Sequence, residues 1–316
     1  MYEQFYGLTE PPFNLTPDPK FFFQSETHAH ALDLLKYGIS RGEGFIVVYG
    51  EIGTGKTTLC RTVLEGIPAE VYTALILNPF LSETDLLRTI LQDFGVLSQG
   101  APSPGRLVTT HDLITILNTF LLSIMQLNGR AVVLIDEAQN LPIATMEQLR
   151  ILSNLETAKQ KLLQIVLVGQ SELKGVLDRQ ELRQLAQRVS IWCELNPFSL
   201  EETTDYIRHR LAVASAGKGR ASFAPDALKI VQRYSGGTPR LINLIADRCL
   251  TAGMAASSTT IDANMAKQAV EALELDRLRR QRKAKPKGPA WWISLGALLA
   301  LALVAVVFWL LKFVKM

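Results

Sequence analysis

The feature that most constrains this chain is a glycine-rich segment between an apolar run and a stretch of helical period. The run Phe45–Tyr49 is followed by eight residues that fit the pattern G-x-x-x-x-G-K-[ST]: Gly50, Glu51, Ile52, Gly53, Thr54, Gly55, Lys56 and Thr57. Strand, loop and helix are the context in which this pattern forms a phosphate-binding loop. Its glycines let backbone N–H groups turn toward phosphate oxygens at the positive end of the following helix. We therefore predict a nucleotide site here.

The side chains that end this loop indicate ATP and Mg²⁺ as the ligands. The ammonium of Lys56 is expected to reach the β- and γ-phosphates, and the hydroxyl of Thr57 to hold Mg²⁺. Thr58, the next residue of the predicted helix, completes the set of expected phosphate-binding residues.

Two neighbouring carboxylates follow a second apolar run. Ala131–Ile135 leads directly into Asp136 and Glu137. Because ligands of parallel sheets bind at the carboxyl ends of the strands, we expect both acids beside the phosphate-binding loop. Asp136 is predicted to contact Mg²⁺, in part through its water shell, and Glu137 to polarise the water that attacks the γ-phosphate.

Five further positions are weaker candidates for the same site. Gln170 follows an apolar run and offers an amide that can steady the attacking water. Arg188 or Arg183 can reach the γ-phosphate of a neighbouring subunit, as an arginine supplied in trans does in phosphoryl transfer. Arg240 starts a helix of the second domain, and Asn78 can hydrogen-bond the catalytic carboxylate and gate it. The alternative for the arginines is a surface salt bridge, and for Asn78 a turn before a proline.

Hydrophobic patterning predicts an α/β fold followed by a helical domain. Five apolar, β-branched runs alternate with stretches of helical period, at 45–49, 72–77, 131–135, 164–168 and 190–195. This alternation predicts a parallel five-stranded sheet covered by helices. After Phe198 the strand signals stop, and helices are expected at 201–214, 225–234, 239–255 and 262–274. We therefore expect an α/β nucleotide-binding domain over 1–196 and a small all-helical lid domain over 197–276.

Charge is distributed unevenly along the chain. Residues 277–316 hold nine of the 33 basic residues and no acid, which leaves 24 bases against 30 acids in residues 1–276. The body is therefore acidic. Because binding to nucleic acid by charge needs a basic face, this balance argues against that class of protein.

The end of the sequence predicts a membrane anchor. Residues 291–311 carry no charge, and a helix of about this length spans a hydrocarbon layer of roughly 30 Å. Trp291, Trp292 and Trp309 lie near its ends, where indole rings prefer to be. A basic linker at 277–290 precedes this run, and its charge predicts that the large N-terminal part is cytoplasmic.

Other reactive or aromatic side chains are expected to serve packing. The histidines have no carboxylate or thiol at a ligand spacing, so surface or packing roles are expected for His28, His30, His111 and His209. Free, buried thiols are expected for Cys60, Cys193 and Cys249. The N-terminus either folds over a nucleotide base or packs onto the core through its aromatic residues, Tyr2, Phe5, Tyr6, Phe13 and Phe21–Phe23.

Ordered blocks of sequence from Met1 to about Glu274 resemble one known family. The blocks are Met1–Leu8, Pro11–Phe13, Pro17–Pro19, Gly50–Thr58, Ile135–Leu141, Asn154–Thr157, Lys161–Ile165, Leu182–Arg188 and Gly236–Asn243. They are similar to the ExeA-like general secretion pathway protein A family and to the related MshM-like ATPases of MSHA-pilus biogenesis, within the AAA+ class. The resemblance implies strand order 5-1-4-3-2, a helical lid and a ring of subunits that assembles with nucleotide.

The resemblance also implies roles for single residues. Gln170 corresponds to the first sensor of nucleotide, Arg240 to the second, and Arg188 to the arginine that acts between subunits. The sequence departs from the family at Ser171, where a proline is frequent, and at 190–193, where the family is more basic and aromatic. Neither departure removes a phosphate ligand.

Members of this family energise assembly of the bacterial envelope, either secretin insertion in type II secretion or the building of a pilus. The resemblance implies an ATPase of the bacterial inner membrane, anchored by one helix, that forms a homo-oligomeric ring and acts with an integral membrane partner. Many members continue into a peptidoglycan-binding domain. Because this sequence stops at Met316, we expect a partner to make that contact. Two other functions stay open: a DNA-associated ATPase of the transposition-regulator or initiator type, and a scaffold that binds ATP with little turnover.

Overall fold

The computed structural model describes residues 2–98, 109–158 and 160–284. The chain divides into two compact units, Met1–Val270 and Glu271–Met316. The first unit contains the predicted sheet and most of the helices expected after it. We call residues 19–195 of this unit its sheet half and residues 200–270 its helical half. The predicted domain boundary at residue 196 lies inside the first unit, between these two halves.

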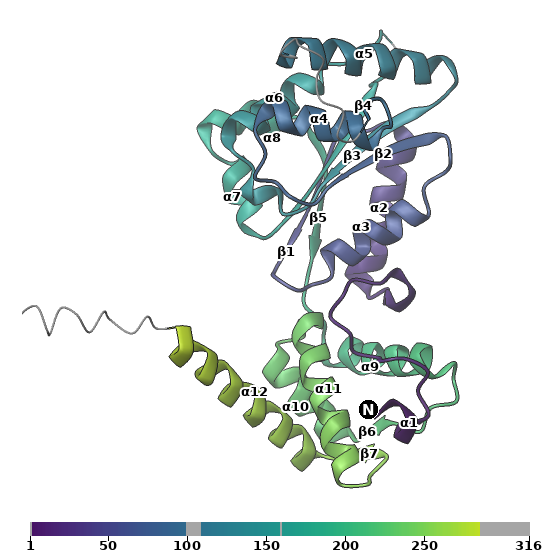
Figure 1. Cartoon of the computed structure of the whole chain (residues 1–316), viewed down its shortest axis with the longest axis vertical. Helices are drawn as coiled ribbons and strands as arrows, with labels where there is room; N and C mark the ends of the chain where they lie inside the picture. Colours follow the sequence, from purple (N-terminus) through teal and green to yellow (C-terminus); the bar gives the residue numbers. More distant parts are fainter. Residues whose placement is uncertain (1, 99–108, 159, 285–316) are drawn as a thin grey trace, which may run out of the picture. The chain divides into compact units, whose positions relative to one another are not determined.

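A five-stranded parallel sheet forms the centre of the sheet half (Figure 1). The strands are β1 (Phe45–Gly50), β2 (Val71–Ile76), β3 (Arg130–Ile135), β4 (Leu163–Gly169) and β5 (Val189–Leu195). Their order is β2-β3-β4-β1-β5, so the expected order is confirmed. Strand β1, which carries the glycine-rich loop at its end, pairs in parallel with β4 and β5. Each of the five predicted runs agrees with its strand to within one residue at either end.

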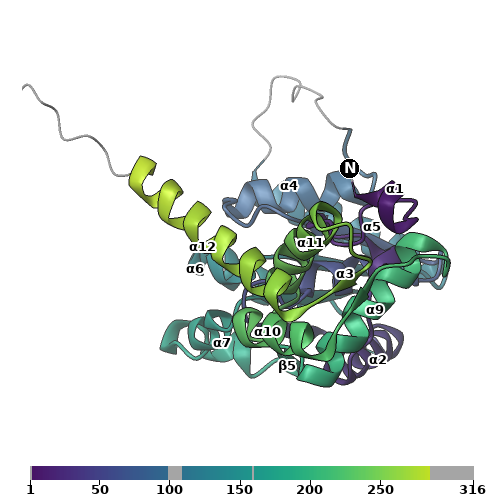
Figure 2. The same ribbon diagram turned by 90° about the horizontal axis from the view of Figure 1, so that it is seen from below.

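Helices cover both faces of the sheet. One face packs against α2 (Glu26–Arg41) and α3 (Lys56–Glu65) through a buried cluster that includes Leu35, Leu59 and Val48. The other face is covered by α4 (Glu83–Asp93), α5 (Thr110–Gln126), α6 (Ile143–Leu152), α7 (Glu172–Leu177) and α8 (Arg183–Ala186). In Figure 2, α4 and α2 lie on opposite sides of the sheet half. Burial on both faces explains why the strands are continuous apolar runs without alternation.

The helical half begins at α9 (Leu200–Ser215) and continues with α10 (Pro225–Ser235), α11 (Pro239–Ala255) and the start of α12 (Ala263–Ala284). A capping box starts α9, because the Ser199 hydroxyl accepts from the Glu202 amide while the Glu202 carboxylate accepts from the Ser199 amide. The expectation of an all-helical composition is wrong at one point. Two short strands, β6 (Ser222–Phe223) and β7 (Thr260–Ile261), pair in parallel. Strands of two residues are too short to leave a periodic pattern.

The first residues of the chain pack against the helical half. They form α1 (Glu3–Tyr6), and the Tyr6 hydroxyl donates to the carbonyl of Leu250 at 3.0 Å. The Thr9 hydroxyl donates to the Ala214 carbonyl at 2.7 Å. These contacts fix the N-terminal segment to α9 and α11, although the predicted boundaries group it with the sheet.

The C-terminal helix is longer than expected. The predicted helix at 262–274 extends to Ala284, because Leu, Arg, Gln, Lys and Ala dominate the following residues and all favour helix. The first part of the predicted linker at 277–290 is therefore helical. Within the described residues, no helix is both long enough and apolar enough to cross a bilayer. The predicted membrane helix at 291–311 lies outside the described residues.

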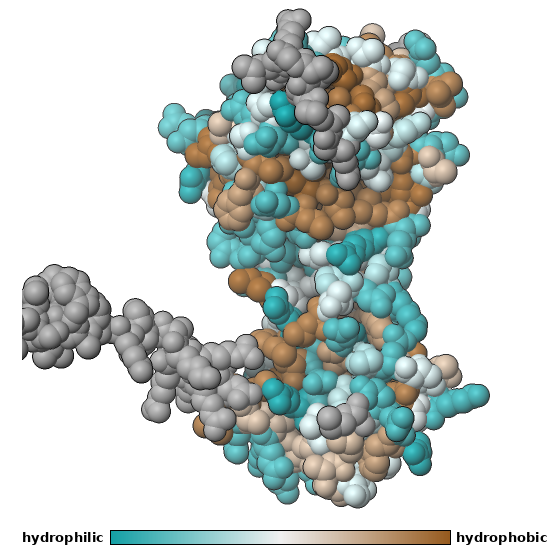
Figure 3. Space-filling model, viewed as in Figure 1, coloured by the Kyte–Doolittle hydropathy of each residue, from teal (hydrophilic) through white to brown (hydrophobic). Residues whose placement is uncertain are grey.

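Hydrophobic residues gather on the surface of the sheet half, on the face seen in Figure 3. Among the exposed large hydrophobic side chains, Leu77 and Phe80 follow β2 and are 52% and 75% exposed. Both lie at the carboxyl edge of the sheet, the edge where a ligand of a parallel sheet binds.

The three cysteines behave as the sequence predicts. Cys60, Cys193 and Cys249 are free and buried. Burial raises the pKa of the Cys193 thiol to about 11, so this thiol stays protonated at neutral pH.

Candidate functional site

The carboxyl ends of three strands bring the predicted residues to one edge of the sheet. Gly50 ends β1, Asp136 follows β3, and Gln170 follows β4. Since β4 lies between β1 and β3, the loops after these strands are neighbours. Residues separated by about 120 positions in the sequence therefore meet here.

Two separate structural features explain why the loop contains glycines. A Cβ at Gly50 would lie 2.4 Å from the carbonyl oxygen of Leu195 on β5, so a side chain does not fit. Gly53 and Gly55 have φ angles of 83° and 99°, in the left-handed region that side chains disfavour. Immediately after Gly55, α3 begins at Lys56, and the backbone amides of its first turn have no partner within the helix. These features fit a bound phosphate chain.

Lys56 is folded against its own loop. Its Nζ donates to the carbonyl oxygens of Gly50 and Glu51, both at 2.8 Å. Burial lowers the pKa of Lys56, while the nearby carboxylates of Glu137 and Asp136 oppose that shift. The ammonium is thus held in a partly desolvated position, where its attraction for phosphate oxygens is strong.

Thr57 and Asp136 meet directly. The Thr57 hydroxyl donates to Asp136 Oδ2 at 2.6 Å, and Asp136 Oδ1 accepts from the Glu137 amide at 2.8 Å. Asp136 is only 5% exposed. A hydroxyl oxygen and a carboxylate oxygen are the hard ligands that Mg²⁺ prefers, so the donor set fits the predicted metal.

Glu137 is held in place by two glutamines. Its Oε2 accepts from Gln139 Nε2 at 2.7 Å and from Gln170 Nε2 at 3.0 Å. The backbone of Glu137 has a φ of 53°, a strained conformation for a residue with a side chain. Gln139 Oε1 in turn accepts from the backbone amide of Gln170 at 3.0 Å. The predicted pair of Glu137 and Gln170 is brought together, and Gln139, which we had not assigned to the site, completes it.

The expected contact between Asn78 and Glu137 is replaced by other bonds. Asn78 Oδ1 accepts from the Phe80 amide at 3.2 Å, which is the turn that the alternative interpretation expects. Both bonds to the Glu137 carboxylate described above come from glutamines. An asparagine side chain readily accepts a hydrogen bond from the backbone amide two residues later, and this favours the local turn.

The two arginines considered for action in trans differ in their surroundings. Arg188 Nη1 donates to the carbonyl of Arg150 at 3.0 Å and to Asn154 Oδ1 at 2.7 Å, at the C-terminal end of α6. It also donates to Ser153 Oγ at 2.5 Å. Arg188 therefore serves an internal contact. Arg183, at the start of α8, is exposed.

Arg240 links the helical half to the phosphate-binding loop. Its backbone amide donates to the Gly53 carbonyl at 3.2 Å. A Cβ on Gly53 would lie 2.7 Å from the Arg240 Cβ, so the glycine also permits this close approach. Arg240 begins α11 together with Pro239, and it lines the same cavity as Lys56.

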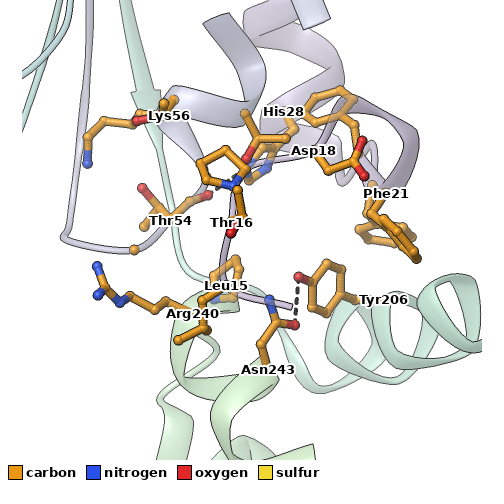
Figure 4. A pocket seen from close by; sticks show the side chains of 18 of the residues that line it. Leu15, Thr16, Asp18, Phe21, His28, Thr54, Lys56, Tyr206, Arg240 and Asn243 are labelled. Atoms are coloured by element: carbon orange, nitrogen blue, oxygen red, sulfur yellow. Dashed lines mark hydrogen bonds between the residues drawn. The ribbon is translucent and has the colours of Figure 1, made fainter. Parts of the chain in front are cut away.

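A cavity of about 200 Å³ joins these residues to an aromatic region. Figure 4 shows Lys56 and Arg240 on one side of it and Phe21 and Tyr206 on the other. The Tyr206 hydroxyl donates to Asn243 Oδ1 at 2.9 Å. We call the Lys56 side the phosphate end and the Tyr206 side the aromatic end.

Arg210 of α9 supports the aromatic end. It is 6% exposed, and its guanidinium donates to the carbonyls of Pro12 and Asn14 and, at 2.9 Å, to the Tyr206 hydroxyl. The same guanidinium lies 4.6 Å from the centre of the Phe21 ring. One buried cation therefore holds the N-terminal segment against the helical half.

The N-terminal aromatic residues divide between the cavity and the packed interior. Phe21, Phe22 and Phe23 line the cavity. The others pack elsewhere: Tyr6 is fully buried in the helical half, and Phe13 contacts Phe223 with ring centres 6.4 Å apart.

His28 is a residue of the site that the sequence analysis missed. It lies on α2, is 2% exposed, and lines the cavity. Its Nε2 is 2.8 Å from the Thr54 carbonyl oxygen of the phosphate-binding loop. No metal-type spacing or motif marks His28, because the contact joins α2 to a loop 26 positions further along the chain.

Comparison with known proteins agrees with this geometry. A family model described as an AAA domain matches residues 39–177. General secretion pathway protein A of Aeromonas hydrophila is 47% identical over 261 residues, which cover 83% of this chain and 46% of the relative. The chain therefore spans about half the length of that relative.

Solved structures share the fold. Cdc6p of Pyrobaculum aerophilum is 17% identical, with a TM-score of 0.62 over 79% of this chain and 67% of that chain. The ORC1 protein of Aeropyrum pernix, in complex with DNA, is 16% identical, with a TM-score of 0.60 over 89% of this chain and 74% of that chain. The RuvB branch migration motor of Thermotoga maritima is 20% identical, with a TM-score of 0.51 over 80% of this chain and 70% of that chain. At these identities the likeness concerns the fold alone.

The parallel sheet and the glycine-rich loop at its carboxyl edge agree with the AAA domain match over residues 39–177. Over 83% of its length the chain is similar to general secretion pathway protein A, the resemblance that the sequence blocks predict.

Proposed function

We propose that the chain is an ATPase that binds ATP together with Mg²⁺ and hydrolyses it. The observation that carries this proposal is the hydrogen bond of 2.6 Å from the Thr57 hydroxyl to Asp136, between the phosphate-binding loop and the end of β3. These two oxygens are suited to hold Mg²⁺ beside the phosphates. When bound, Mg²⁺ neutralises charge that develops on the phosphate oxygens.

The residues around this pair have distinct roles in the proposed reaction. Lys56 exchanges its bonds to the loop carbonyls for bonds to the β- and γ-phosphates. The amides at the start of α3 bind the phosphate chain. Glu137 accepts a hydrogen bond from water and orients it for attack, while Gln170 and Gln139 hold its carboxylate in that position.

An arginine from a neighbouring subunit completes the proposed site. Of the two candidates, we favour Arg183, because it is exposed, whereas Arg188 is engaged by three oxygens of its own chain. The exposed hydrophobic residues Leu77 and Phe80 at the same sheet edge are consistent with association of subunits. Arg240, from α11, lines the same cavity as Lys56 and is proposed to respond to the phosphates.

The proposed hydrolysis is tested by comparing the full chain with its Glu137→Gln variant. Removal of the charge that orients water should reduce the turnover number by about 100-fold or more and leave ATP affinity within about threefold. Equal turnover in both proteins would remove Glu137 from its role. An equally low rate in both, with ATP bound, would support the scaffold instead.

We further propose that this ATPase acts from the cytoplasmic face of the bacterial inner membrane on an envelope-assembly machine of the secretion or pilus type. The support is the relationship to general secretion pathway protein A and the uncharged run at 291–311 that follows a basic linker. In this proposal a ring of subunits passes the motion of the helical half to an integral membrane partner. Fractionation of cells that produce the full chain tests the anchor: the protein should leave the membrane with detergent and not with high salt.

A further inference from the structure

The phosphate-binding loop is held from outside by two hydrogen bonds to its carbonyl oxygens. The Gly53 carbonyl accepts from the backbone amide of Arg240 at 3.2 Å, and the Thr54 carbonyl lies 2.8 Å from His28 Nε2. The second bond comes from a side chain, so a substitution can remove it without changing the backbone. This makes the role of His28 open to experiment.

The bonding partners of the His28 ring determine its protonation. A carbonyl oxygen only accepts, so Nε2 must carry the proton that is donated to Thr54. On the other side of the ring, Nδ1 is 2.7 Å from the Ser25 hydroxyl, which is free to donate to it. Burial lowers the pKa of His28, in keeping with a neutral ring at pH 7.

The bond to Thr54 sets the direction of the next amide. The Thr54 carbonyl and the Gly55 N–H belong to one planar, trans peptide unit and point in opposite directions. When Nε2 holds the carbonyl oxygen on the outside of the loop, the Gly55 N–H is turned toward the inside, where a phosphate would lie. A Cβ on Gly55 would be 3.2 Å from Nε2, so the ring lies directly against this peptide.

The position of Ser25 and His28 explains how the ring is fixed. Ser25 is the N-cap of α2, and its hydroxyl accepts from the His28 amide. The ring also packs against two aromatic rings, with centres 6.0 Å away for Phe22 and 5.4 Å away for Phe198. The first turn of α2 therefore presents Nε2 to the loop in one orientation.

We propose that His28 is a positioning residue for nucleotide binding, which acts by donating a hydrogen bond from Nε2 to the Thr54 carbonyl and so directs the Gly55 amide toward a phosphate of the nucleotide. The proposal rests on the proposed function, because it requires that the loop binds ATP. His28 itself touches the loop and forms no bond to the phosphates.

Two substitutions of His28 separate the hydrogen bond from the packing of the ring. His28→Gln keeps an N–H donor at nearly the same reach and loses the ring. His28→Phe keeps a ring between Phe22 and Phe198 and loses the donor. In the full chain, ATP affinity should fall by about 10-fold in His28→Phe, the worth of one hydrogen bond, and by less than about threefold in His28→Gln.

A purely structural role for the ring predicts the reverse order, with His28→Gln the weaker binder. That order, or unchanged affinity in His28→Phe, would overturn the proposal. Thermal unfolding of both variants is measured in parallel, so that a variant that fails to fold is recognised. If His28→Phe does not fold, the comparison of wild type with His28→Gln still tests the proposal, because a loss of affinity beyond about threefold would contradict rescue by the donor.

Ser25 and Ser82 provide a matched pair of controls. Each is the N-cap of a helix, of α2 and α4, and accepts from a backbone amide three residues later. Replacement of either by Ala should lower the free energy of unfolding by about 1 kcal/mol. Only Ser25→Ala should also weaken ATP binding, by roughly threefold to 10-fold, since only Ser25 orients the His28 ring. Equal ATP affinity in both variants would count against the proposed orientation.

Failure of this proposal is distinguishable from failure of the proposed function. If the wild-type chain binds no ATP with Mg²⁺ in calorimetry, the function is wrong and His28 has no ligand to position. If the wild type binds ATP and the substitutions of His28 follow the structural order, the function stands and the positioning role is wrong.

Discussion

The two ends of the cavity are built in different ways. At the phosphate end, the loop and the start of α3 form one continuous stretch, Gly50–Thr58, and two acids complete it from the end of β3. At the aromatic end, the side chains come from the N-terminal segment, α9 and α11, and Arg210 joins α9 to residues almost 200 positions earlier. The first end is local in sequence, and the second depends on the tertiary fold.

This difference indicates that one end controls the affinity for ligand and the other the stability of the fold. A local loop provides backbone amides and one ammonium, and these bind phosphate through charge. The aromatic end holds together the N-terminal segment and the helical half, so the same residues that shape it also stabilise the fold. We therefore expect substitutions at the phosphate end to change affinity, and substitutions at the aromatic end to change stability.

The largest effect is expected for Lys56→Met. Loss of the ammonium that meets the β- and γ-phosphates should weaken ATP binding by about 1,000-fold, or about 4 kcal/mol. The free energy of unfolding should change little, because the loss of the bonds from Lys56 Nζ to the Gly50 and Glu51 carbonyls is offset by relief of the burial that lowers the pKa of Lys56. Calorimetry and urea unfolding measure the two quantities. A marked loss of stability would break the distinction between the ends.

At the aromatic end, Arg210→Met should produce the opposite pattern. The substitution keeps much of the apolar stem and leaves the carbonyls of Pro12 and Asn14 without their buried donor. The free energy of unfolding should fall by about 3 kcal/mol, since bonds to a charged donor are involved. Urea unfolding measures this loss. Arg208→Met on the same helix, where the side chain is 74% exposed, is the control and should change stability little.

A smaller effect is expected for Tyr206→Phe. The change removes one hydroxyl, which donates to Asn243 and accepts from Arg210, both at 2.9 Å. The free energy of unfolding should fall by about 1 to 2 kcal/mol, and the ring contacts should remain. Tyr37→Phe, at a tyrosine that is 55% exposed on α2, is a suitable comparison. Similar losses in both variants would argue against a structural role for the buried hydroxyl.

The smallest expected effect is a dependence of stability on mildly acidic pH. Burial lowers the pKa of His28 and of His209 from the ordinary value of 6.5, and at His28 the hydrogen bond to the Thr54 carbonyl and the charge of Glu202 oppose this shift more weakly. The unfolded chain therefore takes up protons near pH 6.5, before the folded chain does. Stability should be fully present above this pH and decline as the pH falls below it.

Urea unfolding at several pH values between about 5.5 and 7.5 tests this dependence, in a range where carboxylates scarcely titrate. The decline should be shallower in His28→Gln than in the wild type. Parallel curves would show that His28 contributes nothing to it. His30→Gln serves as the control, because His30 also lies on α2 but outside the cavity.

The sheet and the phosphate end could be predicted because their signals are continuous in sequence. Buried parallel strands such as β1 are short apolar runs, and the loop needs glycine at 50, 53 and 55 for close approach or for positive φ. The acids Asp136 and Glu137 follow from the same rule, because a residue after a parallel strand lies at the ligand edge.

The rest of the site depends on contacts between distant segments, which no local pattern records. His28 occupies a buried position on α2 and looks like any packing residue until Thr54 is placed beside it. Gln139 stood in a recognised block, but only the distances to Glu137 and Gln170 identify its part in the site. Asn78 was assigned by its place after β2, and its local turn took precedence.

The chain passes between the two halves twice, once after the N-terminal segment and once between β5 and α9. The first crossing is fixed because that segment is bonded to the Ala214 carbonyl and to Arg210. The second is fixed by the bond from the Phe198 amide to the Gly237 carbonyl, two residues before α11 begins. Both connections therefore end in the helical half at residues that neighbour the cavity, so a change in that half reaches the phosphate end through the backbone as well as through Arg240.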